Sequence, residues 1–390
     1  MNMPTPPGSA GLPARVRLEG VPRVRFYDGT RCPEDVPLPS CLRACLEYLG
    51  DPPGCRHLQG QAATWPMHCG YAYLMGTSGA AFRLLWNPQV WDMANGDVMR
   101  TAEDPRQPVL RAFESVGYAC EILRQEEGRD NGALFRERIA ASLRQGRPVI
   151  GFGVVGPPEC CLITGCDEGG EALIGWSFFQ DFPEFAAGLE FEPTGEFRKR
   201  DWLAETPGIV VIGERGERPE SGEVFRRALD WAIRVTRTPR VRHRRAGLAA
   251  YGAWAEALLR DDQFAGQELA VLHDRYMVHY DATGTVAEGR WYASLFLRQI
   301  AASEPAAAAP LERAAACYVA EHDLMWAVWE FAGGNGVSDA HVRKLAEPRV
   351  RRRIVPLIHL AREKDEQAAG HLEEALLILM KADRGAGRAA

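Results

Sequence analysis

The pattern of hydrophobic and polar positions changes near residue 220. Before that point, short apolar runs alternate with glycine and proline, which is typical of strands and turns. Beyond it, apolar residues recur at helical spacing in segments rich in Ala, Leu, Arg and Glu. We therefore expect residues 1–19 to be a flexible leader, residues 20–218 to form an α+β domain and residues 219–390 to form an all-α domain.

In the first domain the pattern predicts helices followed by strands. The expected helices span residues 37–50, 108–116 and 133–144, and the expected strands span residues 149–155, 160–165, 172–179 and 208–213. Pro39 and Ser40 suit the start of the first helix, and Gly50 suits its end. Gly169-Gly170 suits a hairpin turn between two of the strands. Helices followed by antiparallel strands indicate the α+β class.

In the second domain we expect five or six helices. The predicted spans are residues 221–236, 243–259, 264–278, 284–302, 308–332 and 338–381. The last span should break near Glu347-Pro348, and Pro356 is a second candidate for a break, because proline interrupts the hydrogen bonds of a helix interior. The exposed apolar positions of such long helices would permit a homodimer.

Composition and charge narrow the class of protein. The chain has 390 residues, of which 46% are hydrophobic and 25% are charged, which excludes a fibre and a largely disordered protein. A net charge of −6 argues against a general nucleic-acid binder. We find no apolar run long enough for a membrane span and no secretory signal, so we expect a cytoplasmic protein with reduced thiols. The ten cysteines include no CxxC pair, and we expect neither a metal nor a cofactor.

Three segments in order carry a resemblance to a known family. They are the helix that bears Cys41, the strand start Gly146-Arg-Pro-Val149, and the strand Leu162-Ile-Thr-Gly-Cys-Asp167. This order resembles the papain-like fold of bacteriocin-processing cysteine peptidases and, more closely, the N-terminal domain of the butirosin biosynthesis protein H family. The resemblance implies a papain-like domain followed by a helical domain. It also implies thiol-dependent acyl transfer, or amide or thioester hydrolysis, in bacterial secondary metabolism. The substrate would be a small molecule or peptide, with an acyl carrier protein as a further partner.

Such chemistry needs a thiol at a helix N-terminus and a base that takes its proton. Cys41 is the cysteine nearest to the start of its helix, and we expect it in the first turn as the nucleophile. The alternative is that Cys41 packs as a small hydrophobe on an amphipathic helix. The family's histidine position is taken here by Glu159, which is either a base or ligand contact, or a solvated turn carboxylate.

No histidine occurs between His68 and His243. An imidazole would therefore have to come from His57 or His68, or from His273 or His279 in the helical domain.

Two adjacent thiols follow Glu159. Strand alternation should point one of Cys160 and Cys161 inward and the other outward. Each is a candidate reactive thiol, a candidate metal ligand together with Glu159 and a histidine, or a packing residue.

Further candidates for substrate binding lie in a glycine-rich turn and after a strand. Gly76, Ser78 and Gly79 belong to a Gly-Thr-Ser-Gly turn that could present backbone N–H groups to an anion. Trp176 and Asp181 follow the Cys160-Cys161 strand and could line an aromatic pocket. Ordinary turn formation and core packing are the alternatives.

Two functions stay open at this point. The first is a thiol-dependent acyltransferase or hydrolase. The second is a catalytically degenerate papain-like protein that binds a small molecule or peptide in the former active-site cleft.

Overall fold

The computed structural model describes residues 14–26, 33–53, 69–125 and 131–389, which fall into two compact units. The sheet unit comprises residues 14–26, 40–52, 118–125 and 131–216, and the helical unit comprises residues 33–39, 53, 69–117 and 217–389. The α+β class is confirmed, because 59% of the described residues are helical and eight strands form one antiparallel sheet. The helical unit includes residues 217–389 and also residues 33–39, 53 and 69–117, which the sequence pattern assigns to the α+β domain.

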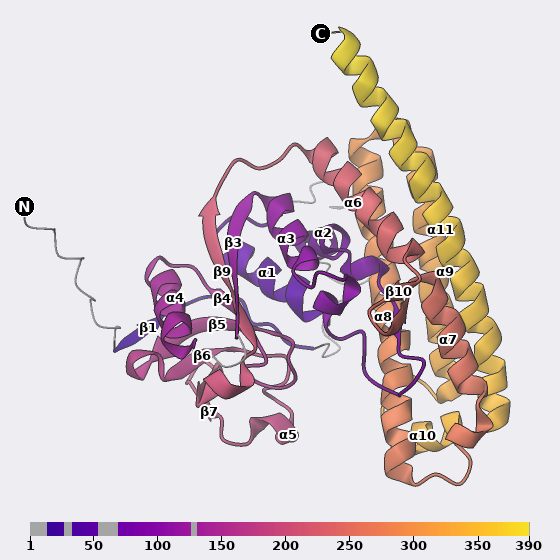
Figure 1. The fold of residues 1–390 in the computed structure, drawn as a ribbon, viewed down its shortest axis with the longest axis horizontal. Helices are drawn as coiled ribbons and strands as arrows, with labels where there is room; N and C mark the ends of the chain where they lie inside the picture. The colour runs from indigo at the N-terminus through magenta and orange to yellow at the C-terminus, as the bar shows by residue number, and fades with distance from the viewer. Residues whose placement is uncertain (1–13, 27–32, 54–68, 126–130, 390) are drawn as a thin grey trace, which may run out of the picture. The chain divides into compact units, whose positions relative to one another are not determined.

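The sheet unit is built on strands in the order β3-β9-β4-β5-β6-β8-β7, with β1 paired to β5 (Figure 1). The strands are β1 (Arg15–Arg17), β3 (Tyr118–Arg124), β4 (Val149–Phe152), β5 (Cys160–Asp167), β6 (Ala172–Trp176), β7 (Glu190–Phe191), β8 (Phe197–Arg200) and β9 (Gly208–Arg215). The helices are α1 (Pro37–Tyr48), whose residues from 40 onward belong to this unit, α4 (Gly132–Arg144) and α5 (Pro183–Ala186). Every residue of β4 and β6 is buried, which explains why these strands read as continuous apolar runs.

Two expected strands are shorter than predicted. The strand expected over 149–155 ends at Phe152, because Gly153 adopts a φ of +67° and its N–H donates to the carbonyl of Glu159 instead of to the sheet. The strand expected over 172–179 ends at Trp176. The expected turn at Gly169-Gly170 is present, and both glycines have positive φ.

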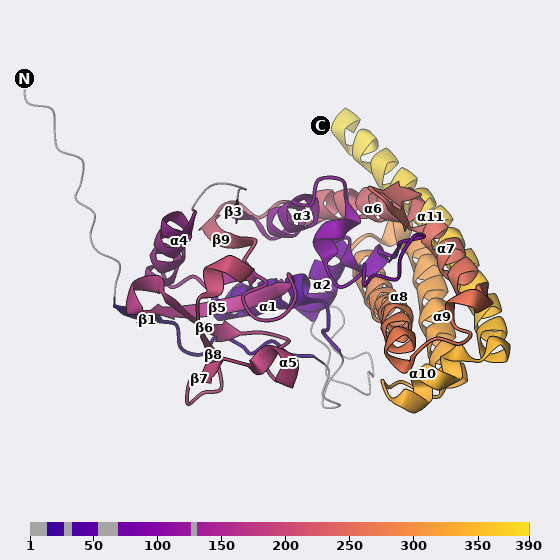
Figure 2. The same cartoon turned by 60° about the horizontal axis from the view of Figure 1, so that its bottom comes forward.

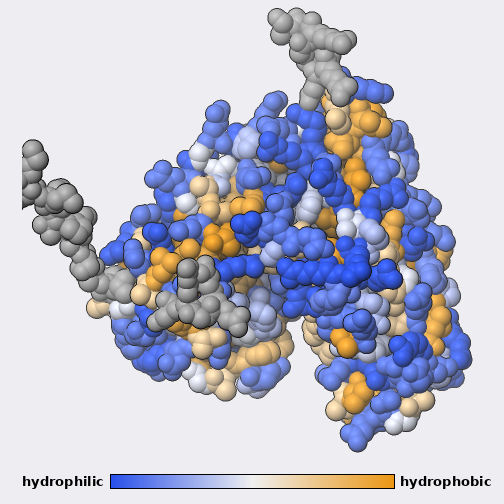
Figure 3. Space-filling view, in the orientation of Figure 1, coloured by the Kyte–Doolittle hydropathy of each residue, from blue (hydrophilic) through white to orange (hydrophobic). Residues whose placement is uncertain are grey.

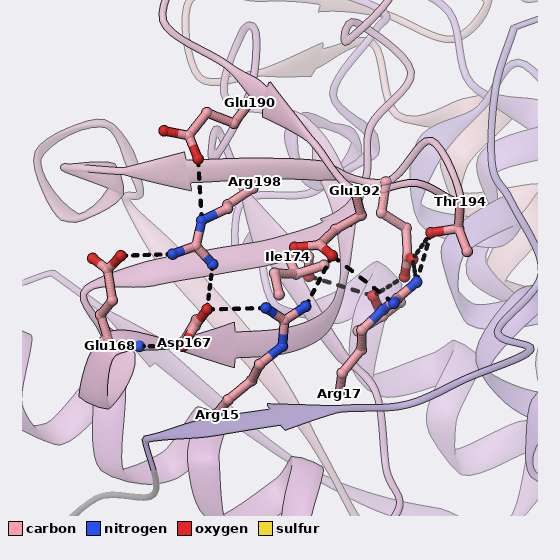
Figure 4. Close-up of polar contacts among 11 residues, drawn as sticks. Arg15, Arg17, Asp167, Glu168, Ile174, Glu190, Glu192, Thr194 and Arg198 are labelled. Atoms are coloured by element: carbon pink, nitrogen blue, oxygen red, sulfur yellow. Dashed lines mark hydrogen bonds and ion pairs between the residues drawn. The ribbon is translucent and has the colours of Figure 1, made fainter.

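Part of the expected leader is a strand. Residues 15–17 form β1, which pairs antiparallel to Gly165–Asp167 of β5. Arg15 donates to Asp167 and Glu192, and Arg17 donates to Thr194 and to the buried Glu196 (Figure 4). These charge-assisted bonds hold β1 on the sheet, and a hydropathy pattern could not predict them.

The helical unit contains three long helices that run side by side (Figures 1 and 2). Its helices are α2 (Cys69–Ser78), α3 (Gln107–Val116), α6 (Ser221–Arg237), α7 (Leu248–Leu259), α8 (Leu269–Ser303), α9 (Ala308–Ala332), α10 (Asp339–Ala346) and α11 (Pro348–Ala389). A small sheet has the order β10 (Arg240–Val241), β11 (Arg244–Ala246) and β2 (Leu85–Trp86). No helix in the described part of the chain carries a stretch long and apolar enough to cross a bilayer.

Some of the predicted helices of this unit have the expected ends, and others are changed by tertiary packing. The span 308–332 and the break at Pro348 are confirmed, whereas Pro356 lies inside α11 without ending it. The two helices expected over 264–278 and 284–302 are one helix, α8, that runs through Gly284. Thr283 and Thr285 are buried beside that glycine, so tertiary packing outweighs its low helix propensity. The helix expected from residue 243 starts at Leu248, because residues 240–246 form the β10–β11 hairpin.

A fully buried ionic cluster joins the long helices. Arg290 of α8 lies 2.6 Å from Asp365 of α11 and 3.3 Å from Glu321 of α9, and all three side chains have no exposed surface. The Tyr251 hydroxyl of α7 lies 2.9 Å from each carboxylate. Burial, and next the Asp365 carboxylate, raises the pKa of Glu321 well above its usual range. The cluster therefore holds one guanidinium against one carboxylate and one neutral carboxyl group.

We expect Arg290→Met to lower the free energy of unfolding by about 3–5 kcal/mol, because it leaves a buried carboxylate without its cation. Glu321→Gln should change it by less than about 1 kcal/mol, because glutamine has the shape of the neutral carboxyl group. Urea unfolding followed by circular dichroism measures both. The matched control is Arg298→Met, which removes a partly exposed arginine of the same helix. Equal losses in Arg290→Met and Arg298→Met would contradict this account.

Candidate functional site

Cys41 lies deeper in its helix than the sequence predicted. Helix α1 begins at Pro37, so Cys41 is its fifth residue and lies in the second turn, not in the first. The free N–H groups of a helix belong to its first turn, so they do not surround this thiol. Cys41 is completely buried.

The thiols of the sheet unit form a packed group. Burial, and next the nearby thiols of Cys161 and Cys45, raises the pKa of Cys41 well above its usual range. Burial also raises the pKa of Cys161 to about 12. At neutral pH both are therefore neutral thiols, whereas a catalytic cysteine needs a lowered pKa. Cys160 is also buried, so the expected alternation of an inward and an outward thiol does not expose either one.

The predicted base lies at the end of the loop before β5. Glu159 is half-buried, and its backbone N–H and C=O are engaged with Pro157 and Gly153. No histidine occurs among the described residues of the sheet unit, and His57 and His68 lie outside the described residues. Among the described residues, no group of three or more His, Cys, Asp or Glu side chains is placed to hold a metal ion, so the ligand set of Glu159, Cys160, Cys161 and a histidine is not assembled there.

The candidate histidines of the helical unit differ in burial. His279 is buried in α8, and its Nδ1 accepts a hydrogen bond from Trp254 Nε1 at 3.1 Å. Burial lowers the pKa of His279 to about 3, so the ring stays neutral and packs among aromatic side chains. His273 is exposed on the same helix.

The segment predicted as a glycine-rich turn is the end of a helix, because Gly76 and Ser78 belong to α2 and only Gly79, with a φ of +86°, leaves it. A Cβ at Gly76 would lie 2.2 Å from the ring of Phe296, and a Cβ at Gly79 would lie 2.3 Å from Trp231 Nε1. Trp231 Nε1 donates to the Ser78 carbonyl at 3.0 Å. All three predicted residues of the turn are buried, and the two glycines allow close approach of aromatic rings.

Trp176 and Asp181, the other two predicted binding residues, converge in the sheet unit. Arg23 bonds to the Asp181 carboxylate at 2.5 Å, and its guanidinium lies 5.1 Å from the centre of the Trp176 ring. The sequence pattern gave no reason to include Arg23, because it lies 158 residues from Asp181 in the chain.

An aromatic surface lies beside this group and consists of Phe26, Phe179, Phe182 and Phe185. Phe179 contacts the other three, with ring centroids 5.2 to 6.2 Å apart. Phe182 and Phe185 are 41% and 37% exposed. In Figure 3, pale orange patches lie in the region where Figure 1 labels α5 and β7. Exposed aromatic rings in one place are typical of binding surfaces.

The sequence pattern did not indicate Glu288, a buried carboxyl group of the helical unit whose pKa is raised. Glu288 Oε1 accepts bonds from the Tyr71 hydroxyl at 2.5 Å and from the Asp35 N–H at 2.9 Å. Burial, and next the Asp35 carboxylate, raises the pKa of Glu288 to about 8. These partners lie more than 200 residues from Glu288 in the chain, so only the fold brings them together.

Comparison with known proteins does not assign the chain to a family. No family model matches the chain, and no curated protein gives a significant match.

Thiol labelling tests the state of the cysteines. We expect Cys41 and Cys161 to resist iodoacetamide between pH 5 and about 8 in the folded protein, because burial keeps both as neutral thiols. Both should react once urea unfolds the chain. Mass spectrometry of the peptides measures the labelling, and the half-buried Cys120 is the internal control. Rapid labelling of Cys41 at neutral pH would contradict this prediction.

The pH dependence of stability tests Glu288. An unfolded glutamate has a pKa of about 4.3, so between that value and about 8 the folded state binds more protons than the unfolded state. The free energy of unfolding should therefore fall as pH rises through this window and level off above it. Glu288→Gln should remove this contribution.

Urea unfolding between pH 5 and about 9 measures the difference between the wild type and Glu288→Gln across that window. In Tyr71→Phe the fall should extend to higher pH, because the Tyr71 hydroxyl lowers the pKa of Glu288. Parallel wild-type and Glu288→Gln profiles would contradict the assignment.

Proposed function

We propose that the sheet unit is a papain-like domain that binds a small molecule or peptide through an aromatic group, and that its cysteines pack rather than catalyse. The observation that carries this proposal is the convergence of Trp176 and Asp181 on Arg23, beside the aromatic surface. This is the binding alternative of the two functions that the resemblance left open.

The aromatic surface and the Arg23 guanidinium at its border suit a ligand that has both an apolar part and a negatively charged group. Phe182 and Phe185 offer ring faces and edges to an aromatic or acyl group. At its border, Arg23 is stacked on Trp176 and paired to Asp181, whose side chain is 61% exposed. A ligand with a negatively charged group could share the Arg23 guanidinium while its apolar part covers the rings.

Thiol-dependent acyl transfer is the competing proposal. It would need an ionised thiol, and the raised pKa values of Cys41 and Cys161 oppose that state. It would also need a base for the proton, and Glu159 is the candidate for that role. Labelling of Cys41 at neutral pH, together with turnover of a thioester, would favour acyl transfer and overturn the binding proposal.

The probe 1-anilinonaphthalene-8-sulfonate tests the binding surface, because it combines aromatic rings with an anion. We expect the folded protein to enhance its fluorescence, and Phe182→Ser with Phe185→Ser to weaken binding by about tenfold or more, since each substitution removes a large apolar contact. The matched control is Phe191→Ser, which removes a ring that is 50% exposed on β7. Equal loss in Phe191→Ser, or no enhancement by the wild type, would contradict the proposal.

A further inference from the structure

A second polar site lies in the helical unit, in a groove between α3 and α6. The groove has a volume of about 280 Å³ and is lined by Gln107, Leu110, Arg111, Glu114, Arg227 and Asp230. This is slightly below the range of drug-sized pockets, which begins at about 300 Å³. The groove therefore suits a small metabolite.

Arg111 is the unusual residue of the groove. Its guanidinium lies 4.3 Å from the centre of the Trp231 ring, and its Nε is buried without a hydrogen-bond partner. Across the described ranges, from residue 14 to residue 389 with their gaps, Arg111 makes no ion pair or side-chain hydrogen bond. Burial, and next the charge of Arg234, lowers its pKa. A cation that is partly desolvated and unpaired is ready to bind an anion.

Of the other charged side chains at the groove, two form ion pairs and one does not. Arg227 is paired with Glu223 at 2.5 Å, and Asp230 is paired with Arg234 at 2.9 Å. Glu114, three residues from Arg111 on α3, makes no side-chain ion pair or hydrogen bond with any described residue. The groove thus offers one unpaired guanidinium and one unpaired carboxylate. A phosphate dianion would be repelled by Glu114 and Asp230, whereas a molecule with one carboxylate and one ammonium group complements the site.

A smaller cavity of about 30 Å³ shares Arg111, Glu114 and Arg227 with the groove. Val224, Ala228 and Pro219 give it an apolar wall, and Thr77 and Ser115 add hydroxyl groups. A cavity of this size holds a water-sized or methyl-sized group and excludes an aromatic ring.

We propose that this groove binds a small free amino acid, with its carboxylate on Arg111, its ammonium group on Glu114 and its side chain in the smaller cavity. Alanine and serine fit this description, and phenylalanine does not. The site goes beyond the proposed function, because its residues all belong to the helical unit and none belongs to the aromatic surface.

Binding of L-alanine, L-serine and L-phenylalanine to the full chain tests the proposal, with isothermal titration calorimetry as the measurement. We expect L-alanine or L-serine to bind at least about tenfold more tightly than L-phenylalanine, acetate, ethylamine or inorganic phosphate. Equal binding of acetate would overturn the proposal, because a simple anion would then satisfy the site. No binding of L-alanine or L-serine would overturn it as well.

Two variants locate the site. Arg111→Met and Glu114→Gln should each weaken binding by about tenfold or more, since each removes a charge-assisted contact. Arg111→Met keeps an apolar contact with Trp231, and its melting temperature without ligand should equal or exceed that of the wild type. The control is Arg106→Met, which removes an arginine paired with Asp104 just before the same helix. Unchanged affinity in Arg111→Met, or equal loss in Arg106→Met, would place the ligand elsewhere and contradict the proposal.

Discussion

The burial of Arg290 is the constraint that orders the helical unit. A guanidinium without exposed surface needs both charge compensation and acceptors for its N–H groups. Both Nη groups of Arg290 find acceptors, and its Nε lies against the Glu321 carboxyl group without a hydrogen bond. Asp365 and Glu321 supply the carboxyl groups, while the carbonyls of Ala81 and Arg83 accept from Nη1 at 2.8 and 3.2 Å. The last two bonds fix the turn that follows α2 against α8. A short segment near residue 80 is therefore placed by a side chain more than 200 residues later in the chain.

This placement extends to the groove. The turn held by Arg290 follows Ser78, the last residue of α2, whose carbonyl accepts from the Trp231 indole, and Gly79 makes room for that ring. Trp231 in turn stacks on Arg111. Residues 76–79 therefore do not bind an anion themselves. They position the Trp231 ring, and that ring packs against the Arg111 guanidinium. The Ser78 carbonyl is engaged with Trp231, and Arg111 is the group available to a ligand.

The sequence pattern predicted correctly those helices and strands in which the local sequence and the tertiary packing favour the same structure. Helix α9 matches its predicted span at both ends, and strands β4, β5 and β6 were located by their apolar runs. The differences have physical causes that lie outside any local window. Gly284 would end an isolated helix, but buried threonines on either side continue α8 through it. Strand β1 depends on Arg15 and Arg17 meeting carboxylates more than 150 residues away. Among the site residues, Trp176 and Asp181 were proposed as possible lining of an aromatic pocket, and the structure places both against Arg23. Arg23, Glu288 and Arg111 could be found only from the fold.

The two arginines of the helical unit show how burial separates a structural charge from a binding charge. Arg290 loses all of its hydration and regains the interaction energy through carboxylates and carbonyls within the chain. Arg111 loses part of its hydration and gains the contact with one indole ring and the attraction of the nearby Asp230 and Glu114 charges, but no ion pair or side-chain hydrogen bond with a described residue. A methionine would make that contact without the cost of desolvating a charge, so the arginine is a poor choice for packing alone. The same reasoning explains the cysteines of the sheet unit, where full burial suits a neutral thiol and opposes a thiolate. A buried group with ion pairs and hydrogen bonds inside the chain holds the fold together, and a partly desolvated charge without an ion pair or hydrogen bond to a described residue is available to a ligand.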